Sequence, residues 1–172
     1  EEKHYLCRVE DVVLLPTVGE TIARMNSLGV PVVVATNQAG VARGYFSESS
    51  VHAVHARIDE LLKPFNAHID RYEYCPNHPT EGLGAYRVDC GARKPQPGML
   101  TRAAAALQID LDCSCMIGDR RGDLEAGFRA GCATALVRTG YGHLEQLDFA
   151  PESLRFLGAF DCLEQAVAVW LK

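Results

Sequence analysis

The chain has 172 residues, of which 48% are apolar and 23% charged, a composition typical of a globular protein with room for one domain and a real core. Its formal net charge of -5 argues against a nucleic-acid-binding surface, although a small anion needs only a few local donors. The sequence holds no apolar run near the roughly 20 residues of a membrane helix, and its acidic start, EEKHYLCRVED, is no signal peptide.

Helix-like and strand-like segments alternate along the chain. Apolar residues at helical spacing indicate the helices, and β-branched runs such as PVVVATN indicate strands that we expect to be buried on both faces. Gly29 is a good helix stop, Pro97 suits the first turn of a helix, and Ser47 or Ser49 can cap another. The predicted helices are residues 17–30, 49–65, 98–109, 123–131 and 162–172, and the predicted strands are residues 31–37, 70–75, 113–119 and 132–140.

This alternation predicts an α/β fold with a parallel sheet and helices on both of its faces. The sequence contains no internal repeat, linker or low-complexity tract, so we expect one domain over residues 1–172 and, from its size, a monomer. Ligands of such sheets bind at the carboxyl ends of the strands. The polar residues just past each strand are therefore the candidates for a site.

The first candidate is ATNQAGVARGYF, which follows the strand predicted at 31–37. Thr36, Asn37 and Gln38 offer a hydroxyl and two amides, and with free backbone N–H groups they form a neutral cradle for an anion. Gly40 and Gly44 would let the backbone approach a ligand closely. The alternative is a polar turn before a helix.

The second candidate is GARKPQPGML, where Arg93 and Lys94 precede two prolines. The prolines stiffen the loop, and the compact charge of Lys94 suits a phosphoryl oxygen. Surface Lys-Pro pairs are common, so this motif alone would indicate an ordinary loop.

The third candidate is MIGDRRGDLEAG. Asp119 lies at the end of a strand and Asp123 at the start of a helix, and hard cations such as Mg²⁺ take carboxylate oxygens at such a place. We expect Asp119 to be the metal ligand and Asp123 to orient it. The alternative for Asp123 is a helix-capping residue that binds no metal.

Taken together, three motifs in this order, each at the carboxyl end of a strand, are far more specific than any one of them. The chain resembles the haloacid dehalogenase (HAD) superfamily of phosphatases on TNQAGVARGYF, CPNHP, RKPQPGML, MIGDRRGDLEAG and VRTGYG. Within it, the chain resembles the subfamily of heptose-bisphosphate and histidinol-phosphate phosphatases, over nearly its whole length. This resemblance implies a HAD-like Rossmannoid sheet without a large cap domain, so that the loops at 40–46 and 76–93 would shape specificity.

The resemblance also implies a reaction. An aspartate attacks the phosphorus to form an aspartyl-phosphate, a second aspartate two residues on protonates the leaving alcohol, and Mg²⁺ holds nucleophile and phosphate together. The implied substrate is a small sugar phosphate, the 7-phosphate of D-glycero-D-manno-heptose 1,7-bisphosphate, on the pathway to surface heptose. The stretch at 42–46 favours this substrate over histidinol phosphate, and neither a nucleic acid nor a membrane is an expected partner.

Carried over from the resemblance, Thr36 would hydrogen-bond the phosphoryl oxygens, Lys94 would neutralise their charge, and Asp119 would coordinate Mg²⁺. The residues that would face the sugar phosphate are Thr36, Asn37, Gln38, Ala39, Arg93, Lys94 and Arg120, together with the stretch around Tyr5.

Two features depart from the family pattern, and the first concerns the nucleophile. The family aspartates belong to an apolar strand that ends in Asp-x-Asp-Gly-Thr, and these 172 residues contain no such segment, since Asp11 precedes its apolar run VVLLP. We expect the full protein to carry about a dozen more residues before this sequence, because the family motif comes just before the segment that matches EEKHY. The 172 residues alone would then be inactive. The alternative is a non-catalytic, phosphate-binding relative.

The second departure concerns zinc. The family often has a zinc loop with the pattern Cys-x-His followed by Cys-x-Cys, and those positions here read Cys75, Asn77, Cys90 and Ala92. Tetrahedral zinc takes four N or S ligands, so we do not expect zinc here, although His78 could substitute for one ligand. Seven scattered cysteines favour reduced thiols and a cytoplasmic protein. The histidines at 52 and 55 are expected to serve in packing or at the surface.

Overall fold

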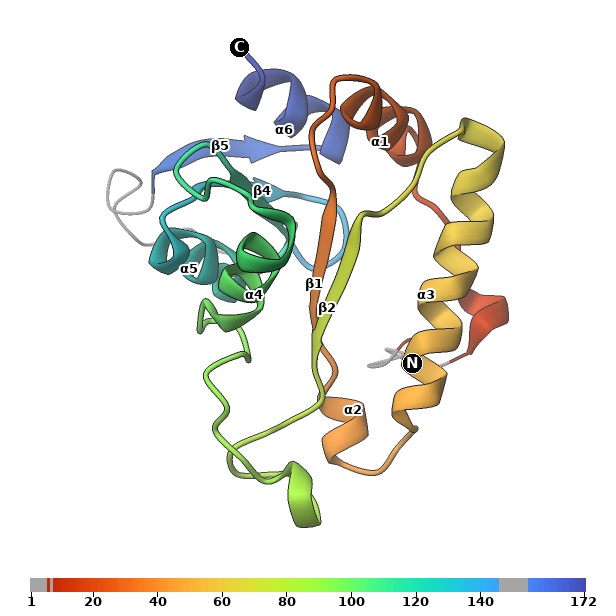
Figure 1. Ribbon diagram of the computed structural model, residues 1–172, viewed down its shortest axis with the longest axis vertical. Helices are drawn as coiled ribbons and strands as arrows, with labels where there is room; N and C mark the ends of the chain where they lie inside the picture. Colours follow the sequence, from red (N-terminus) through yellow and green to blue (C-terminus); the bar gives the residue numbers. More distant parts are fainter. Residues whose placement is uncertain (1–5, 7, 146–154) are drawn as a thin grey trace. The chain divides into compact units, whose positions relative to one another are not determined.

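The computed structural model describes residue 6, residues 8–145 and residues 155–172 (Figure 1). These residues divide into two compact units, residues 1–93 and 94–172. Each unit contains a parallel sheet and helices, which confirms the predicted α/β class. Among the described residues, no helix is long and apolar enough to span a bilayer. The prediction of one domain over 1–172 stays a prediction.

The first unit contains a parallel pair of strands and the helices that connect them (Figure 1). The pairing runs from Val33 with Arg71 to Asn37 with Cys75, so the residues that follow the two strands emerge at the same edge of the sheet. The elements are η1 (Val9–Asp11), α1 (Val18–Ser27), β1 (Val33–Asn37), α2 (Ala39–Ala42), α3 (Glu48–Leu62), η2 (Lys63–Phe65), β2 (Arg71–Cys75) and η3 (Gly84–Tyr86).

Two helix ends in this unit lie at residues that the sequence analysis predicted as helix signals. The hydroxyl of Ser47 accepts a hydrogen bond from the backbone N–H of Ser50 at 3.3 Å, so Ser47 is the cap of α3. Gly29 follows the last turn of α1 with a φ of 70°, the left-handed conformation that ends helices. Both predicted signals are confirmed.

The second unit contains a three-stranded parallel sheet in the order β3-β4-β5, of which Figure 1 labels β4 and β5. The pairing of Gly118 with Leu136 brings the carboxyl ends of β3 and β4 to the same edge. The elements are α4 (Gly98–Leu107), β3 (Cys115–Gly118), α5 (Arg121–Ala130), β4 (Ala133–Val137), β5 (Phe156–Phe160) and α6 (Leu163–Trp170).

Alternate residues of β4 pack against different helices. Leu136 packs with Leu124 of α5, whereas Ala135 and Val137 pack in a cluster with Ala166 of α6. Because successive side chains of a strand point to opposite faces, α5 and α6 cover opposite faces of this sheet. The predicted arrangement of helices on both faces is thus confirmed within the second unit.

Two details differ from the sequence predictions. Every residue of β1 and of β3 is only half-buried, although both strands were expected to be buried on both faces. Among the described residues, β1 belongs to a two-stranded sheet with β2, and β3 is the first strand in the order β3-β4-β5, so neither strand is central in its sheet. The sequence analysis also missed β5, a short strand interrupted by Gly158 at a φ of 139°.

Candidate active site

The carboxyl edge of the second sheet positions Asp119, which directly follows β3. The backbone N–H of Tyr141, in the loop after β4, donates to Asp119 Oδ2 at 2.9 Å. Because β3 and β4 end at the same edge, this hydrogen bond joins the two loops at the place where ligands of parallel sheets bind.

Gly140 provides the space that the Asp119 carboxylate occupies. Its φ is 61°, and a Cβ added to it would lie 2.3 Å from Asp119 Oδ2. Any larger residue would therefore displace the carboxylate as well as strain the backbone. Gly140, the first glycine of the VRTGYG segment, is thus required by its contact with Asp119.

Asp123 joins the loop that carries Lys94 to the start of α5. Its Oδ1 lies 2.7 Å from Lys94 Nζ, and its Oδ2 accepts a hydrogen bond from the backbone N–H of Arg120 at 3.0 Å. The side chains of Lys94 and Asp123 are only 13% and 9% exposed. Asp123 is thus a capping residue of α5 and the ion-pair partner of Lys94, and its orienting effect on Asp119 stays a prediction.

Arg120 lies beside these groups, with its guanidinium 3.6 Å from the centre of the Tyr141 ring. Such cation–π contacts hold a guanidinium over an aromatic face. Lys94, Asp119, Arg120, Asp123 and Tyr141 form what we call the rim cluster. It combines carboxylates, two cations and an aromatic ring at one edge of a sheet.

The donor chemistry of the rim cluster fits a magnesium ion. Mg²⁺ usually takes one or two carboxylates and completes its shell with water and substrate phosphate oxygens. Asp119 supplies one carboxylate, whereas both oxygens of Asp123 already have protein partners. Across the described part of the chain, no group of three or more His, Cys, Asp or Glu is arranged to hold a metal, so Asp119 is the carboxylate of the rim cluster that could hold the ion.

The carboxyl edge of the first sheet carries the predicted anion cradle. Gln38 Nε2 donates to Thr36 Oγ1 at 3.1 Å, and the backbone N–H of Gln38 donates to the carbonyl of Cys75 at 2.8 Å. The expectation that Gly40 and Gly44 let the backbone approach a ligand closely stays a prediction, and the structure gives Gly40 a further role. A Cβ at Gly40 would lie 2.1 Å from the Phe46 ring, so this glycine accommodates a side chain of the protein.

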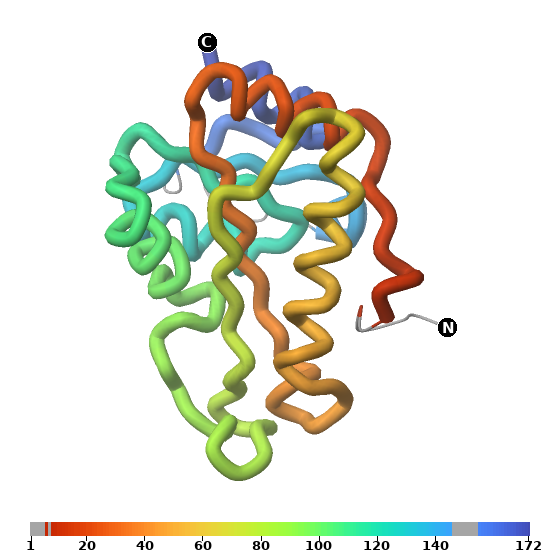
Figure 2. Tube along the Cα trace, turned by 45° about the vertical axis from the view of Figure 1, so that its right-hand side comes forward, coloured from red at the N-terminus to blue at the C-terminus, as the bar shows by residue number. Residues whose placement is uncertain are grey.

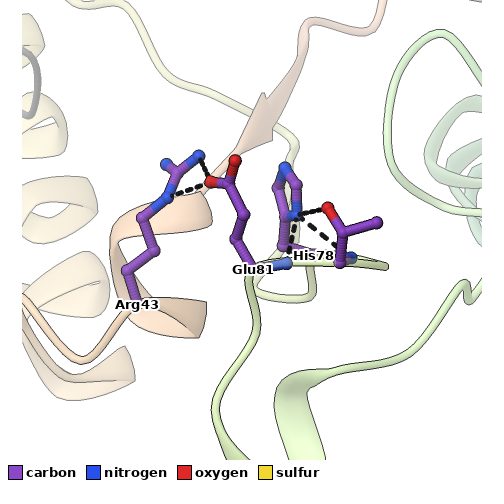
Figure 3. Close-up of polar contacts among 4 residues, drawn as sticks. Arg43, His78 and Glu81 are labelled. Carbon is purple, nitrogen blue, oxygen red and sulfur yellow. Dashed lines mark hydrogen bonds and ion pairs between the residues drawn. The ribbon is translucent and has the colours of Figure 1, made fainter.

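The loop between β2 and Arg93 extends from the strand ends and turns back through η3 (Figure 2). Arg43, which follows α2, is bonded to Glu81 in this loop through Nε at 2.6 Å and also through Nη2 (Figure 3). The backbone N–H of Leu83 donates to the carbonyl of Ala42 at 2.8 Å. These contacts join the two loops that were expected to shape specificity.

His78 organises the turn beside this ion pair (Figure 3). Its Nδ1 accepts from the backbone N–H groups of Glu81 at 3.0 Å and Thr80 at 3.4 Å. Desolvation and the nearby Arg93 charge lower the pKa of His78, which favours the neutral ring that this acceptor role requires.

Glu48, at the start of α3, holds η3 and β2. Its two carboxylate oxygens accept hydrogen bonds from the hydroxyls of Tyr74 at 2.6 Å and Tyr86 at 2.8 Å. These two bonds lower the pKa of Glu48. The Arg43–Glu81 pair and Glu48 with its two tyrosines are called the loop fastenings below.

The two histidines of α3 have packing roles, as expected. His52 Nε2 lies 2.9 Å from the hydroxyl of Tyr74, and the buried His55 ring stacks on Tyr72 with centroids 4.2 Å apart. Burial lowers the pKa of His55, so its ring packs as a neutral group.

Arg93 has a donor without a protein partner. Its Nη1 atom is buried and makes no hydrogen bond to any described residue. Such a buried donor is costly unless something accepts from it, and an anionic oxygen is a suitable acceptor.

The thiols of Cys75 and Cys90 lie together, with their sulfurs 3.5 Å apart. The donors around them do not fit tetrahedral zinc, because Asn77 and Ala92 occupy the other two positions of the pattern, and an alanine offers no ligand. His78 Nδ1 is occupied by two backbone donors.

The structure thus brings Lys94 together with Asp123, Asp119 with Tyr141, and Thr36 with Gln38. That Thr36, Lys94 and Asp119 meet at one phosphate stays a prediction, and the stretch around Tyr5 lies outside the described residues. Sequence reasoning missed Tyr141, Glu81 and Glu48. Only Tyr141 had a local signal, since it belongs to a motif already singled out.

The chain is similar to a known family and to known proteins. Residues 91–157 match the family model described as HAD-hydrolase-like. The D-glycero-beta-D-manno-heptose-1,7-bisphosphate 7-phosphatase of Pseudomonas putida is 38% identical over 149 residues, which are 87% of this chain and 81% of that protein. The alpha-named heptose bisphosphatase of Burkholderia mallei is 36% identical over 133 residues, covering 77% of this chain and 70% of its own length.

A solved structure shows the same likeness in three dimensions. The D,D-heptose 1,7-bisphosphate phosphatase from B. bronchiseptica, complexed with magnesium and phosphate, superposes with a TM-score of 0.81 at 30% identity. The match covers 98% of this chain and 88% of that one. With relatives this similar along most of their length, the chain belongs to the HAD-like phosphatases, a family of phosphomonoester hydrolases, and within them to the heptose-bisphosphate phosphatase group.

Proposed function

We propose that this protein is a magnesium-dependent phosphatase that removes the 7-phosphate of D-glycero-D-manno-heptose 1,7-bisphosphate in the cytoplasm. The observation that carries the proposal is the rim cluster, in which a carboxylate and a lysine that is only 13% exposed lie at the carboxyl edge of one parallel sheet. Relatives of both anomeric names are similar to this chain, at 38% and 36% identity, so the proposal names the heptose and leaves the anomer open.

In this proposal Asp119 holds Mg²⁺, which when bound screens the charge between a nucleophile and the phosphate. Lys94 presents its ammonium to the phosphoryl oxygens, and Asp123 fixes that ammonium by the 2.7 Å ion pair. The Thr36 hydroxyl donates a hydrogen bond to a phosphoryl oxygen. Gln38 Nε2 donates a hydrogen bond to the oxygen of the same hydroxyl. The buried Nη1 of Arg93 supplies a further donor to the sugar phosphate, whose other contacts come from Asn37, Ala39 and Arg120.

The attacking aspartate belongs, in this proposal, to a strand outside these 172 residues. The sequence contains no apolar run that ends in Asp-x-Asp-Gly-Thr. The reaction would form an aspartyl-phosphate on that strand, which water then hydrolyses.

Preference for the heptose would come from loop shape. Arg43, in the stretch that favours the heptose enzyme, is bonded to Glu81, so its role is to hold the loop against residues 42–46. The loop fastenings would thus select among substrates by the space they leave.

The test is phosphate release from heptose 1,7-bisphosphate and from histidinol phosphate, with and without Mg²⁺. It would use the 172-residue chain and a chain extended by the in-frame codons upstream of Glu1. We expect turnover of the heptose substrate by an extended chain that includes the Asp-x-Asp-Gly-Thr strand, and none by the 172 residues. Faster release from histidinol phosphate would overturn the substrate, and an extended chain that binds phosphate without turnover would indicate a non-catalytic relative.

The metal assignment has its own test in the extended chain. Asp119→Asn should lower kcat by at least about 100-fold and abolish Mg²⁺ binding measured by calorimetry. The matched control is Asp112→Asn, which makes the same charge change at an exposed side chain before β3, at the opposite end of that strand. Full activity of Asp119→Asn would refute the role of this carboxylate.

A further inference from the structure

The first unit holds a pair of thiols for which the proposed reaction has no use. Cys75 is the last residue of β2 and Cys90 lies 15 residues later, near the end of the loop that carries the fastenings. Their sulfurs are 3.5 Å apart, and both thiols are free. A disulfide bond requires about 2.05 Å between sulfurs, so the two atoms need to approach by only about 1.5 Å.

The surroundings of the two thiols allow this approach. Cys75 is 1% exposed and is fixed in the strand by its pairing with Asn37, whereas Cys90 is exposed in a loop. Formation of the disulfide therefore requires movement of Cys90 alone. The pair does not complete a zinc site, so no metal is expected to keep the sulfurs apart.

From this geometry we propose that Cys75 and Cys90 form a reversible disulfide that closes the loop over residues 76–89 at its base. The modification is independent of the phosphatase activity proposed above. Its oxidant is a small soluble disulfide such as oxidised glutathione.

The exchange is balanced in two steps. The Cys90 thiolate attacks one sulfur of the small disulfide and releases one thiolate, leaving a mixed disulfide on Cys90. Cys75 then gives up its proton and attacks Cys90 Sγ, which releases the second small thiol. Two protein thiols are oxidised to one disulfide, and one small disulfide is reduced to two thiols.

Local hydrogen bonds support this order of attack. Burial pushes the pKa of Cys90 upward, but the side chain of Asn77 and the backbone at Ala92 and Arg93 outweigh it and hold that pKa below its usual value. Burial raises the pKa of Cys75 to about 11. The exposed thiol is therefore the attacking group, and the buried thiol resolves the mixed disulfide.

Cys113 provides a matched comparison on the same chain. It is also exposed, but a hydrogen bond to Asp110 and the charge of that carboxylate raise its pKa. It should react more slowly with the same oxidant, since thiolates are the nucleophiles.

The experiment incubates the 172-residue protein in buffers of increasing oxidised-to-reduced glutathione ratio, followed by alkylation and peptide mass mapping. We expect a peptide cross-linked between Cys75 and Cys90, a loss of two free thiols per chain, and full reversal by excess reduced glutathione. Cys75→Ser should retain glutathione on Cys90, Cys90→Ser should leave Cys75 unmodified, and Cys113→Ser should cross-link like the parent.

Several results would overturn the proposal. They are a stable glutathione adduct on Cys90 of the parent protein without a cross-link, faster modification of Cys113 than of Cys90, and one equivalent of tightly bound zinc that protects both thiols. The parent protein alone decides the first and third results, so the conclusion does not depend on how the serine variants fold.

Discussion

The rim cluster and the loop fastenings both hold charged side chains near strand ends, but they hold them differently. In the rim cluster, Lys94 and Asp123 are 13% and 9% exposed. In the loop fastenings, Arg43 and Glu81 are 24% and 54% exposed. A buried pair is costly to break because it leaves an uncompensated charge out of water, whereas an exposed pair is replaced by water.

This difference suggests separate tasks for the two regions. The Lys94–Asp123 pair, with little exposure to solvent, can hold a cation in a fixed place for chemistry, which requires accurate position. The loop fastenings tolerate exchange with solvent, which suits a loop that selects substrates by its shape. Four changes test the comparison.

The largest expected effect comes from Lys94→Ala. Removing the lysine leaves the buried Asp123 carboxylate, among the described residues, with only the backbone N–H of Arg120, and we expect a loss of about 3 kcal/mol in the free energy of unfolding. The matched control, Lys63→Ala, removes an exposed lysine and should change it by less than about 0.5 kcal/mol. Urea unfolding of both variants measures the difference.

A double variant sharpens this test. Adding Asp123→Ala to Lys94→Ala removes the unpaired charge, so the double variant should be less destabilised than the sum of the two single changes. Equal losses for Lys94→Ala and Lys63→Ala would show that the ion pair is not buried in solution.

The next effect concerns Gly140→Ala. The new Cβ would lie 2.3 Å from Asp119 Oδ2, so the carboxylate has to move, and we expect Mg²⁺ affinity to fall about tenfold. The left-handed backbone adds a strain of about 1 kcal/mol to the folded state. Calorimetric titration with Mg²⁺ and urea unfolding measure the two effects.

Gly29→Ala separates contact from strain. Gly29 has a similar φ of 70°, but a Cβ there would meet no atom within 4 Å. Gly29→Ala should thus cost a similar strain energy without a change in Mg²⁺ affinity. If both variants bind Mg²⁺ like the parent, Asp119 is not the metal ligand.

The two regions also differ in how much of their structure could be predicted from the sequence. The two carboxylates of the rim cluster were predictable because Asp119 and Asp123 are four residues apart in one motif, at the end of a predicted strand and the start of a predicted helix. Glu48 and Tyr86 are 38 residues apart, and no local pattern indicates that they meet. The burial of β1 was predicted wrongly because an apolar run shows that a strand is apolar but does not show how much of its surface other elements cover. Helices with strong periodicity and clear caps, such as α1 and α3, were predicted well.

A smaller effect is expected from Glu48→Gln, and it should depend on pH. Hydrogen bonds from Tyr74 and Tyr86 lower the pKa of Glu48 below its ordinary value of 4.5. A carboxylate whose pKa is lowered in the folded state stabilises the protein at pH values above its ordinary pKa. This stabilisation is lost as the pH falls through the folded-state pKa. The parent should therefore be more stable than Glu48→Gln at pH 7, and the difference should shrink as the pH falls below 4.5.

Unfolding midpoints between pH 7 and acid measure this dependence. Glu20→Gln is the control, because it neutralises an exposed glutamate in the first turn of α1. A difference between parent and Glu48→Gln that stays constant with pH would mean that the two tyrosines do not hold the charged form of Glu48.

The smallest effect is expected from the Arg43–Glu81 pair, measured as the coupling in a double-mutant cycle of Arg43→Ala and Glu81→Ala. Glu81 is more than half exposed, so solvent competes for both groups and dissolved ions screen their attraction. The coupling free energy of the Arg43–Glu81 pair should be far smaller than that of the Lys94–Asp123 pair. It should disappear when the salt concentration rises from about 0.05 M to about 0.5 M.

A coupling that persists at high salt would contradict the distinction between the two regions, since it would mean that water does not replace the exposed pair. If the coupling is small as expected, the loop must be held chiefly by the backbone bond between Leu83 and Ala42 and by the tyrosines on Glu48. Arg43 would then act by limiting where Glu81 can lie, so its replacement should change the ratio of activities on heptose and histidinol phosphates more than it changes stability.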